Sequence, residues 1–164
     1  MIRRISVVLG AAAFMAFAPL PAQSQIYLGP EVAWRDGADL GLGAGIEFDL
    51  PQLYEGITFM GDFIYFIGGD DFDYFEFNGN LSYDLPLEDV PVVPFGLAGL
   101  NIGRQSSDAE TAGAKVVKTE LGLNLGAGVK FDFGGFRPRV AARYAIGGWE
   151  EFTIYAFLPF RLAN

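Results

Sequence analysis

The chain has 164 residues, contains no cysteine and no histidine, and carries a formal net charge of −9. The absence of cysteine excludes disulfides and thiolate chemistry, and so acidic a chain lacks the basic patches by which proteins bind nucleic acid. Hydrophobic residues make up 51% of the sequence, which excludes a disordered acidic tail, because such tails contain too few apolar residues to form a core.

The first residues are typical of a secretory signal peptide. Two arginines precede an apolar run over residues 5–18, and small residues and prolines follow it. The run is shorter than the roughly 18–20 residues that a membrane-spanning helix needs. We therefore expect a signal peptide over residues 1–22, cleaved after Ala22 or Ser24, and one mature domain over residues 23–164.

The first half of the mature domain alternates apolar and polar residues with a period of two, which predicts β-strands. In the earliest run, Leu28, Val32 and Trp34 share one face, whereas Glu31 and Arg35 share the other. Four strands are expected here, over residues 26–35, 40–50, 57–67 and 74–85. They are separated by a turn over 36–39, a connector over 51–56 and an acidic turn over 68–73.

Four further strands are expected in the second half, over residues 93–104, 118–131, 136–146 and 151–162. The alternation is clearest in the second of these, where Leu121 and Leu123 share a face opposite Glu120 and Asn124. In the first, both rows are apolar or glycine, and the outward row is expected to be Ala98, Leu100 and Ile102. These strands are connected by a polar loop over 105–115, by Gly134-Gly135 and by residues 147–150.

The unbroken apolar rows decide which way the strands face. A soluble barrel turns its apolar rows inward, whereas a transmembrane barrel turns them toward lipid and keeps its polar rows inside. The strand lengths match the roughly 9–11 residues that a tilted spanning strand needs. The sequence therefore predicts an all-β fold: an eight-stranded antiparallel up-and-down transmembrane β-barrel with a lipid-facing outside and a polar, plugged interior. Such an interior has room for side chains but not for a water-filled channel.

The number of strands sets the orientation of the barrel. An even number brings both termini to one side, which for a secreted chain in the bacterial outer membrane is the periplasm. The connectors that then face outside are 36–39, 68–73, 105–115 and 147–150. Trp34 and Trp149 fall near the outer rim, where an aromatic belt is expected. Prolines cannot donate to a strand ladder, and Pro30 is the proline that fits this topology least well.

The inward rows divide by charge along the chain, with acids in the first half and bases in the second. Because an unpaired buried charge is costly, the two sets are expected to neutralise each other across the barrel. The simplest role of these charged side chains is to fill the interior as a packed plug. Arg35 and Glu151 lie at the outer ends of the first and last strands, which must pair, and form a candidate ion pair. The expected interior ion-pair network comprises Glu31, Arg35, Glu47, Asp62, Glu76, Glu120, Arg137, Arg139, Arg143, Glu151 and Arg161.

Small residues beside long ones would give the charged side chains room to cross the interior. If residues 132–135 form the turn of the penultimate hairpin, Gly128 lies opposite Arg139. On the first hairpin, Glu31 lies opposite Gly43. These pairings are expectations about strand register.

The mature chain resembles the small OmpA/OmpX-type outer-membrane barrels of Gram-negative bacteria. The resemblance rests on the signal peptide, the eight amphipathic strands, the charged interior and the apolar last strand. Residues 94–103, with the sequence PFGLAGLNIG, also look like the Pro-aromatic-Gly-rich strand of the outer membrane protein β-barrel domain family. Such barrels usually end in an aromatic residue that the assembly machinery reads. This chain ends in Arg161-Leu162-Ala163-Asn164, so Phe160 is expected to serve instead.

The favoured function is that of a non-catalytic integral outer-membrane barrel with a role in membrane integrity or surface interaction. The alternative is a narrow porin-like passage for ions or small solutes, because the inward glycines leave space unless arginine side chains fill it. Expected partners are outer-membrane lipid and lipopolysaccharide, with the barrel assembly machinery and periplasmic chaperones during biogenesis. The barrel is expected to be a monomer and to bind no nucleic acid.

Catalysis is not expected. Without histidine a Ser–His pair is impossible, and Ser82 has no other suitable base beside it in the pattern. Asp62 and Glu76 could pair for acid–base work, but facing arginines would hold both ionised. Residues 69–73 contain three carboxylates that suit calcium, although a solvated acidic loop explains them as well. No catalytic residue, cofactor or metal site is therefore predicted.

Overall fold

The computed structural model describes residues 25–36, 39–67, 72–85, 87, 92–108, 115–148 and 150–163. The predicted signal peptide and Trp149 lie outside the described residues, as does most of the acidic turn for which calcium was considered. In the described ranges, no helix is both long and apolar enough to pass through a membrane.

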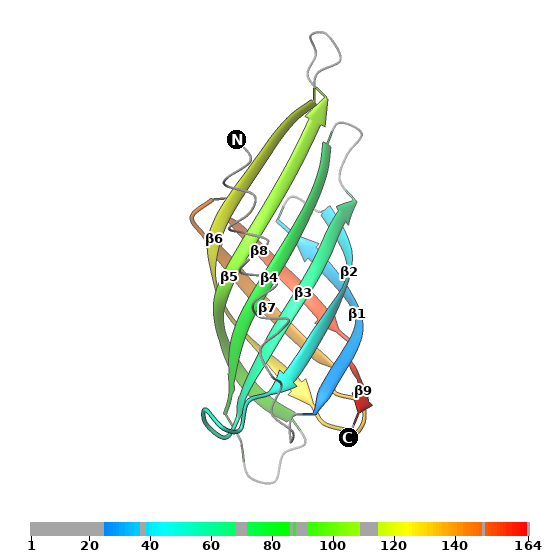
Figure 1. Cartoon of the computed structure of the whole chain (residues 1–164), viewed down its shortest axis with the longest axis vertical. Helices are drawn as coiled ribbons and strands as arrows, with labels where there is room; N and C mark the ends of the chain where they lie inside the picture. The colour runs from blue at the N-terminus through cyan, green and yellow to red at the C-terminus, as the bar shows by residue number, and fades with distance from the viewer. Residues whose placement is uncertain are drawn as a thin grey trace.

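Nine strands of the described chain form one closed antiparallel sheet (Figure 1). Their bounds are β1 (Ile26–Arg35), β2 (Asp39–Asp49), β3 (Ile57–Ile67), β4 (Phe72–Asp84), β5 (Val92–Asp108), β6 (Lys115–Phe131), β7 (Arg139–Ile146), β8 (Glu151–Phe157) and β9 (Phe160–Ala163). β9 continues the line of β8, and both pair with β1. Because β8 and β9 share one position, the barrel has eight strand positions. The predicted antiparallel up-and-down topology is confirmed. We call the end where β1 begins and β9 ends the terminal end, and the opposite end the far end.

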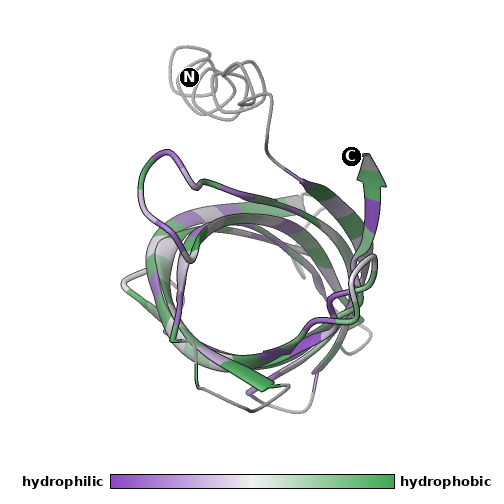
Figure 2. Cartoon of the chain, turned by 90° about the horizontal axis from the view of Figure 1, so that it is seen from below, coloured by the Kyte–Doolittle hydropathy of each residue, from purple (hydrophilic) through white to green (hydrophobic). Residues whose placement is uncertain are grey.

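Side chains alternate between the inside and the outside of the barrel along each strand, as the period of two predicts. On β1, Tyr27 and Glu31 are buried, whereas Trp34 near the far end points outward and is 62% exposed. Apolar side chains therefore cover the outer surface, while polar residues share the interior with aromatic ones such as Phe66 and Phe157. Figure 2 shows the ring of strands from one end, with hydrophilic and hydrophobic residues mixed along the ribbon. This inversion is that of a transmembrane barrel.

The facing of β5 agrees with the prediction. Ala98 and Leu100 are exposed on the outside, and Phe95, Leu97 and Asn101 are buried inside. The ambiguity in the sequence arose because both rows are apolar or glycine. The structure resolves it by placing the side chains of Phe95 and Leu97 in the interior, where they belong to a cluster of buried hydrophobic residues.

The polar loop predicted over residues 105–115 is wrong at both of its ends, where residues 105–108 and Lys115 belong to strands. β5 and β6 stay paired in register out to Asp108 opposite Lys115, so only residues 109–114 fall outside the described structure. β6 begins at Lys115, before the predicted start at Lys118. Val116 and Val117 in this added segment are β-branched and suit a pleated strand. The β5–β6 hairpin is therefore longer than its neighbours, as Figure 1 shows.

The predicted register of the β6–β7 hairpin is wrong by two residues. Lys130, not Gly128, lies opposite Arg139. Phe133 N donates to Phe136 O at 3.0 Å, so the turn contains only Gly134-Gly135, with Gly134 at a φ of 79°. A two-residue turn requires a positive φ that glycine supplies without strain. The predicted pairing of Glu31 with Gly43 on the first hairpin is confirmed.

The last predicted strand is interrupted where the barrel closes. β8 ends at Phe157 and β9 begins at Phe160, because Pro159 has no N–H to donate. Leu158 N donates to Pro30 O at 3.0 Å, but Pro30 cannot donate in return. A side chain at Gly29 would collide with the backbone of Leu158, so the two strands approach closely here. The seam between first and last strands is thus continuous but has fewer hydrogen bonds than an ideal ladder.

Candidate functional site in the barrel interior

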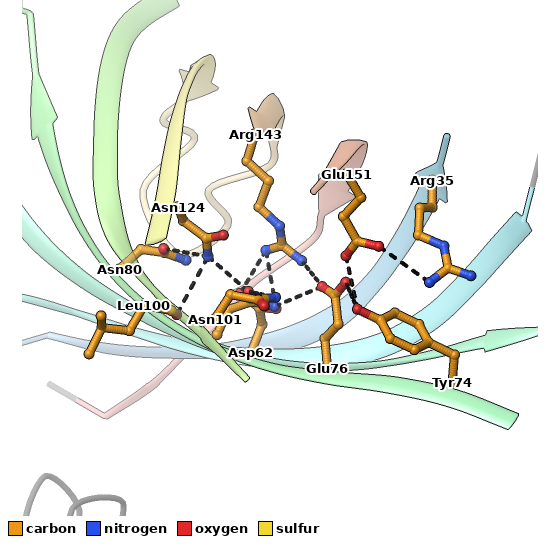
Figure 3. A network of polar contacts seen from close by, with 11 residues as sticks. Arg35, Asp62, Tyr74, Glu76, Asn80, Leu100, Asn101, Asn124, Arg143 and Glu151 are labelled. Carbon is orange, nitrogen blue, oxygen red and sulfur yellow. Dashed lines mark hydrogen bonds and ion pairs between the residues drawn. The ribbon is translucent and has the colours of Figure 1, made fainter. Parts of the chain in front are cut away.

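The centre of the interior is held by Arg143 on β7, which reaches acids on the opposite wall (Figure 3). Its Nη1 lies 3.3 Å from Asp62 Oδ2 on β3, and its Nη2 lies 3.0 Å from Glu76 Oε2 on β4. Asn78 Nδ2 donates to Asp62 Oδ1 at 2.7 Å. Arg143 is 2% exposed, so the two carboxylates, and not bulk water, stabilise its buried charge.

A second layer lies toward the far end, around Arg35 on β1. Arg35 Nη1 lies 3.3 Å from Glu151 Oε2 on β8, and Arg35 also forms an ion pair with Asp39 on β2. The Arg35 guanidinium lies 4.0 Å from the centroid of the Tyr74 ring. Tyr74 Oη is 3.0 Å from both Glu76 Oε1 and Glu151 Oε1. Glu76 therefore joins this layer to the central one.

A third layer lies toward the terminal end. Arg139 on β7 forms an ion pair with Glu47 on β2, and Arg139 Nη1 lies 2.8 Å from Met60 Sδ on β3. Arg139 is 1% exposed, so its partner again lies across the barrel and not in solvent. Lys130 on β6 forms a further buried ion pair with Asp84 on β4.

Arg137 closes the terminal end of the barrel. Its Nη1 lies 2.9 Å from Asp49 Oδ2 at the end of β2, and its Nε lies 3.0 Å from Asp132 Oδ2 in the adjoining turn. The guanidinium stacks over the Tyr27 ring at 4.3 Å from its centroid. Ion pairs thus occur at four successive levels of the interior, and those of Arg143, Arg139 and Arg137 reach strands that are not neighbours of β7.

Four asparagines on β4, β5 and β6 line the wall beside these charges. Asn78 Oδ1 accepts hydrogen bonds from Asn101 Nδ2 at 3.1 Å and from Asn124 Nδ2 at 2.8 Å. Asn124 Nδ2 also donates to Asn80 Oδ1 at 3.0 Å. The amides extend the polar network to the strands that contribute no buried charge at this level.

Three residues predicted to belong to the network lie apart from these layers. Glu31 is 3% exposed, yet its Oε1 has no hydrogen-bond partner in the described structure. Glu120 pairs with Lys118 near the far end, where Lys118 is largely exposed. Arg161 is exposed on β9 opposite Tyr27, so its predicted place in the interior is wrong. The break before β9 puts this residue at the rim, where solvent replaces a partner.

Several residues that complete the layers were not part of the predicted network: Asp39, Tyr74, Asn78, Asp84, Asn101, Asn124 and Lys130. Asp39 falls in the predicted turn over 36–39, whereas the others lie in the inward rows, and that position was the available signal. Neutral amides and a phenol carry no charge that demands a partner, and the partner of each ion depends on the register and tilt of strands across the barrel.

The described interior offers little for catalysis. Ser82 is buried, and its Oγ donates to the backbone carbonyl of Thr58 at 3.4 Å. Asp62 and Glu76, the carboxylates considered for acid–base work, are both held by Arg143. The arrangement is suited to neutralising buried charge and to cross-linking opposite walls.

No protein-family model and no curated protein sequence matches the chain. Solved structures nevertheless share its fold. Neisserial surface protein A (NspA) matches with a TM-score of 0.65 and 15% identity, over 85% of this chain and 97% of NspA. The N-terminal β-barrel domain of Pseudomonas aeruginosa OprF matches with a TM-score of 0.62 and 16% identity, over 85% of this chain and 100% of that domain.

The outer membrane enzyme PagL also matches, with a TM-score of 0.53 and 15% identity, over 85% of this chain and 99% of PagL. The predicted resemblance to small eight-stranded outer-membrane barrels is confirmed at the level of the fold. Identities this low establish the fold alone, and the same barrel serves both enzymes and other proteins.

Proposed function

We propose that the chain is an integral protein of the bacterial outer membrane, with a non-catalytic role in membrane integrity or surface interaction and with both termini in the periplasm. Apolar side chains point outward at every strand position of the barrel, and they support membrane insertion because a soluble protein would not expose so many of them. The similar outer-membrane barrels support the same location.

The observation that carries this proposal is the set of ion pairs that cross the interior. Arg143 and Arg139 are almost fully buried, and each reaches a carboxylate on the opposite side of the barrel. Separating a buried pair leaves an uncompensated charge, which is strongly unfavourable. The interior is therefore held shut and the barrel rigid, as suits a membrane-stabilising protein or a platform for external contacts.

The proposed partners follow from the surface. Outer-membrane lipid and lipopolysaccharide would cover the outward apolar rows, and the barrel would act as a monomer. Phe160 on β9 is 54% exposed and stacks on Phe136, with ring centroids 4.6 Å apart. This outward ring near the end of the last strand is what we propose the barrel assembly machinery reads, after periplasmic chaperones have delivered the chain.

A non-catalytic role is proposed even though PagL is an enzyme with this fold. The sequence contains no histidine, so a Ser–His pair cannot form. Ser82 is buried and bonded to backbone, which leaves it without a base to activate it.

The alternative is a narrow porin-like passage. The observation that favours it is the continuous polar lining, in which ion pairs and asparagines occupy successive levels from one end to the other. A passage would open only if these contacts exchanged partners.

Planar-bilayer conductance of the mature chain tests both functions, after folding has been verified by heat-dependent gel mobility and by sedimentation with outer membranes. We expect a silent bilayer. Reproducible current steps that change in Arg139→Ala, but not in the exposed-residue control Arg161→Ala, would establish the passage instead. A chain that neither folds as a heat-modifiable barrel nor sediments with outer membranes would overturn the membrane assignment itself.

A further inference from the structure

We propose that the barrel interior holds one proton shared between Glu76 on β4 and Glu151 on β8, with Tyr74 bridging them. Tyr74 Oη lies 3.0 Å from Glu76 Oε1 and 3.0 Å from Glu151 Oε1 (Figure 3). All three side chains are buried. The site would bind a proton whichever function the barrel performs.

Counting hydrogen atoms leads to this proposal. A phenol carries one hydrogen and can donate it to one carboxylate only. If Tyr74 donates to Glu76, its contact with Glu151 needs a hydrogen from Glu151, and the reverse holds if Tyr74 donates to Glu151. Two ionised carboxylates would leave one of these contacts as an oxygen–oxygen approach without a proton. One carboxyl of the pair must therefore be protonated for both contacts to be hydrogen bonds.

The charges around the pair point the same way. Arg35 is divided between Asp39 and Glu151. Likewise, Arg143 is divided between Asp62 and Glu76. Two guanidinium groups thus serve four carboxylates, of which Asp62, Glu76 and Glu151 are buried and Asp39 is partly exposed. Since one unpaired buried carboxylate is costly, retention of a proton on the Glu76–Glu151 pair is the cheaper arrangement.

Among the described residues, Glu76 and Glu151 form ion pairs with no cation other than Arg143 and Arg35. β5 presents only neutral residues inward here, namely Asn101, Gly103 and Gln105. On β6 the nearest charged pair is Lys118 with Glu120, which lies closer to solvent. Glu31 on β1 adds a further carboxyl in the interior. The proton belongs to the Glu76–Glu151 pair as a unit, because coupled groups titrate together.

Proton uptake links folding to pH. In the unfolded chain both carboxyls are ionised at neutral pH, so the folded barrel binds one more proton than the unfolded chain. The stability of the barrel then falls as pH rises. For one proton, the folding equilibrium constant drops about tenfold per pH unit, until the folded state also releases the proton.

The test is an infrared titration of the full barrel in detergent, which detects the carbonyl band of a protonated carboxyl. We expect a component of this band in the wild-type barrel at neutral pH that is lost in Glu151→Gln, whereas any component from the buried Glu31 remains. Glu31→Gln is the matched control, because it changes another buried carboxyl of the interior and should not remove the component that is lost in Glu151→Gln. Glu76→Gln removes the same pair and serves if Glu151→Gln does not fold.

Unfolding measured at several pH values gives a second, independent reading. The wild-type barrel should lose stability toward alkaline pH, and the folded Gln variant of the pair should show a flatter dependence. A missing band in the wild type, or a band that survives in a Gln variant of the pair and disappears in Glu31→Gln, would overturn the proposal. Stability that does not fall with rising pH would do the same.

Discussion

At the residue scale, the guanidinium group of a buried arginine can serve two carboxylates at once, as that of Arg143 does. Arg143 contacts Asp62 and Glu76, which lie on adjacent strands, and a planar guanidinium with five donors suits this geometry. Lysine, a compact charge without the fork, could not reach both acids in the same way. The choice of arginine at the central level is thus explained by geometry as well as by charge.

Replacing Arg143 with alanine should strongly destabilise the barrel. The substitution leaves two buried carboxylates without their cation, and breaking a buried pair typically costs about 3–5 kcal/mol. Urea-induced unfolding in lipid vesicles would measure the change in free energy. Arg161→Ala removes the same side chain from an exposed position, and it should change stability by less than about 0.5 kcal/mol. Equal effects of the two substitutions would contradict the inferred role of the central layer.

The sequence indicates which side chains enter the interior but not which of them meet. Parity along each strand placed Arg139 and Glu47 inside, and the structure joins them across the barrel. It also placed Arg161 inside, where the structure has it exposed. Parity is local, whereas contact across the barrel depends on closure, and the break before β9 ends the regular geometry that the parity argument assumed.

At the element scale, glycines in the inward rows let neighbouring backbones approach. Gly126 on β6 lies opposite Arg143 on β7, and a Cβ there would collide with the backbone carbonyl of Ala142. Gly96 on β5 differs, because a Cβ at this outward position would meet no atom within 4 Å. The structure therefore has no room for a side chain at Gly126, whereas it can accept one at Gly96.

Gly126→Ala should weaken the pairing of β6 with β7, because the neighbouring backbone would have to shift. Overpacking of this kind typically costs about 1–3 kcal/mol. Gly96→Ala should be neutral or stabilising by about 0.4–1 kcal/mol, since it restricts only the unfolded chain. Thermal unfolding followed by gel mobility would compare the two variants. A more stable Gly126→Ala would show that β6 and β7 are less closely packed than the structure indicates.

Strand positions were largely predictable from alternation, and the bounds of the first and third strands, 26–35 and 57–67, agree with the structure. Turn lengths were less so. The sequence around Gly134-Gly135 permits a turn of two or of four residues, and the difference moves every partner of β7 by two positions. Polar residues after 104 read as a loop, but solvent-exposed strands also tolerate polar side chains on both faces.

At the scale of the whole molecule, apolar side chains cover the outer surface, whereas a soluble protein would bury them. Leu125 near the middle of β6 is exposed, and so are Leu121 and Leu123, which precede it in the same row. Leu53 is also exposed, but it lies in the connector between β2 and β3. In the membrane we expect Leu125 to contact lipid and Leu53 not to, although both side chains are exposed in the isolated chain.

Leu125→Arg should therefore impair insertion into vesicles, because a cation on the lipid face near the bilayer midplane costs about 2–4 kcal/mol. Leu53→Arg should leave insertion nearly unchanged, since the connector lies outside the hydrocarbon. The fraction of heat-modifiable protein after refolding into vesicles measures this difference. Similar yields for both variants would mean that the outward rows do not face lipid.

The division of charge along the chain has a consequence for the order of events during biogenesis. Four interior acids of the first half, Glu47, Asp62, Glu76 and Asp84, form ion pairs with cations on β6 and β7. The first half of the chain therefore cannot neutralise its buried carboxylates by itself. A partly inserted intermediate with only the first half in place would expose a row of unpaired carboxylates to hydrocarbon. Stepwise insertion of hairpins is thereby disfavoured. We expect the strands to assemble into a nearly complete barrel before any of them spans the bilayer.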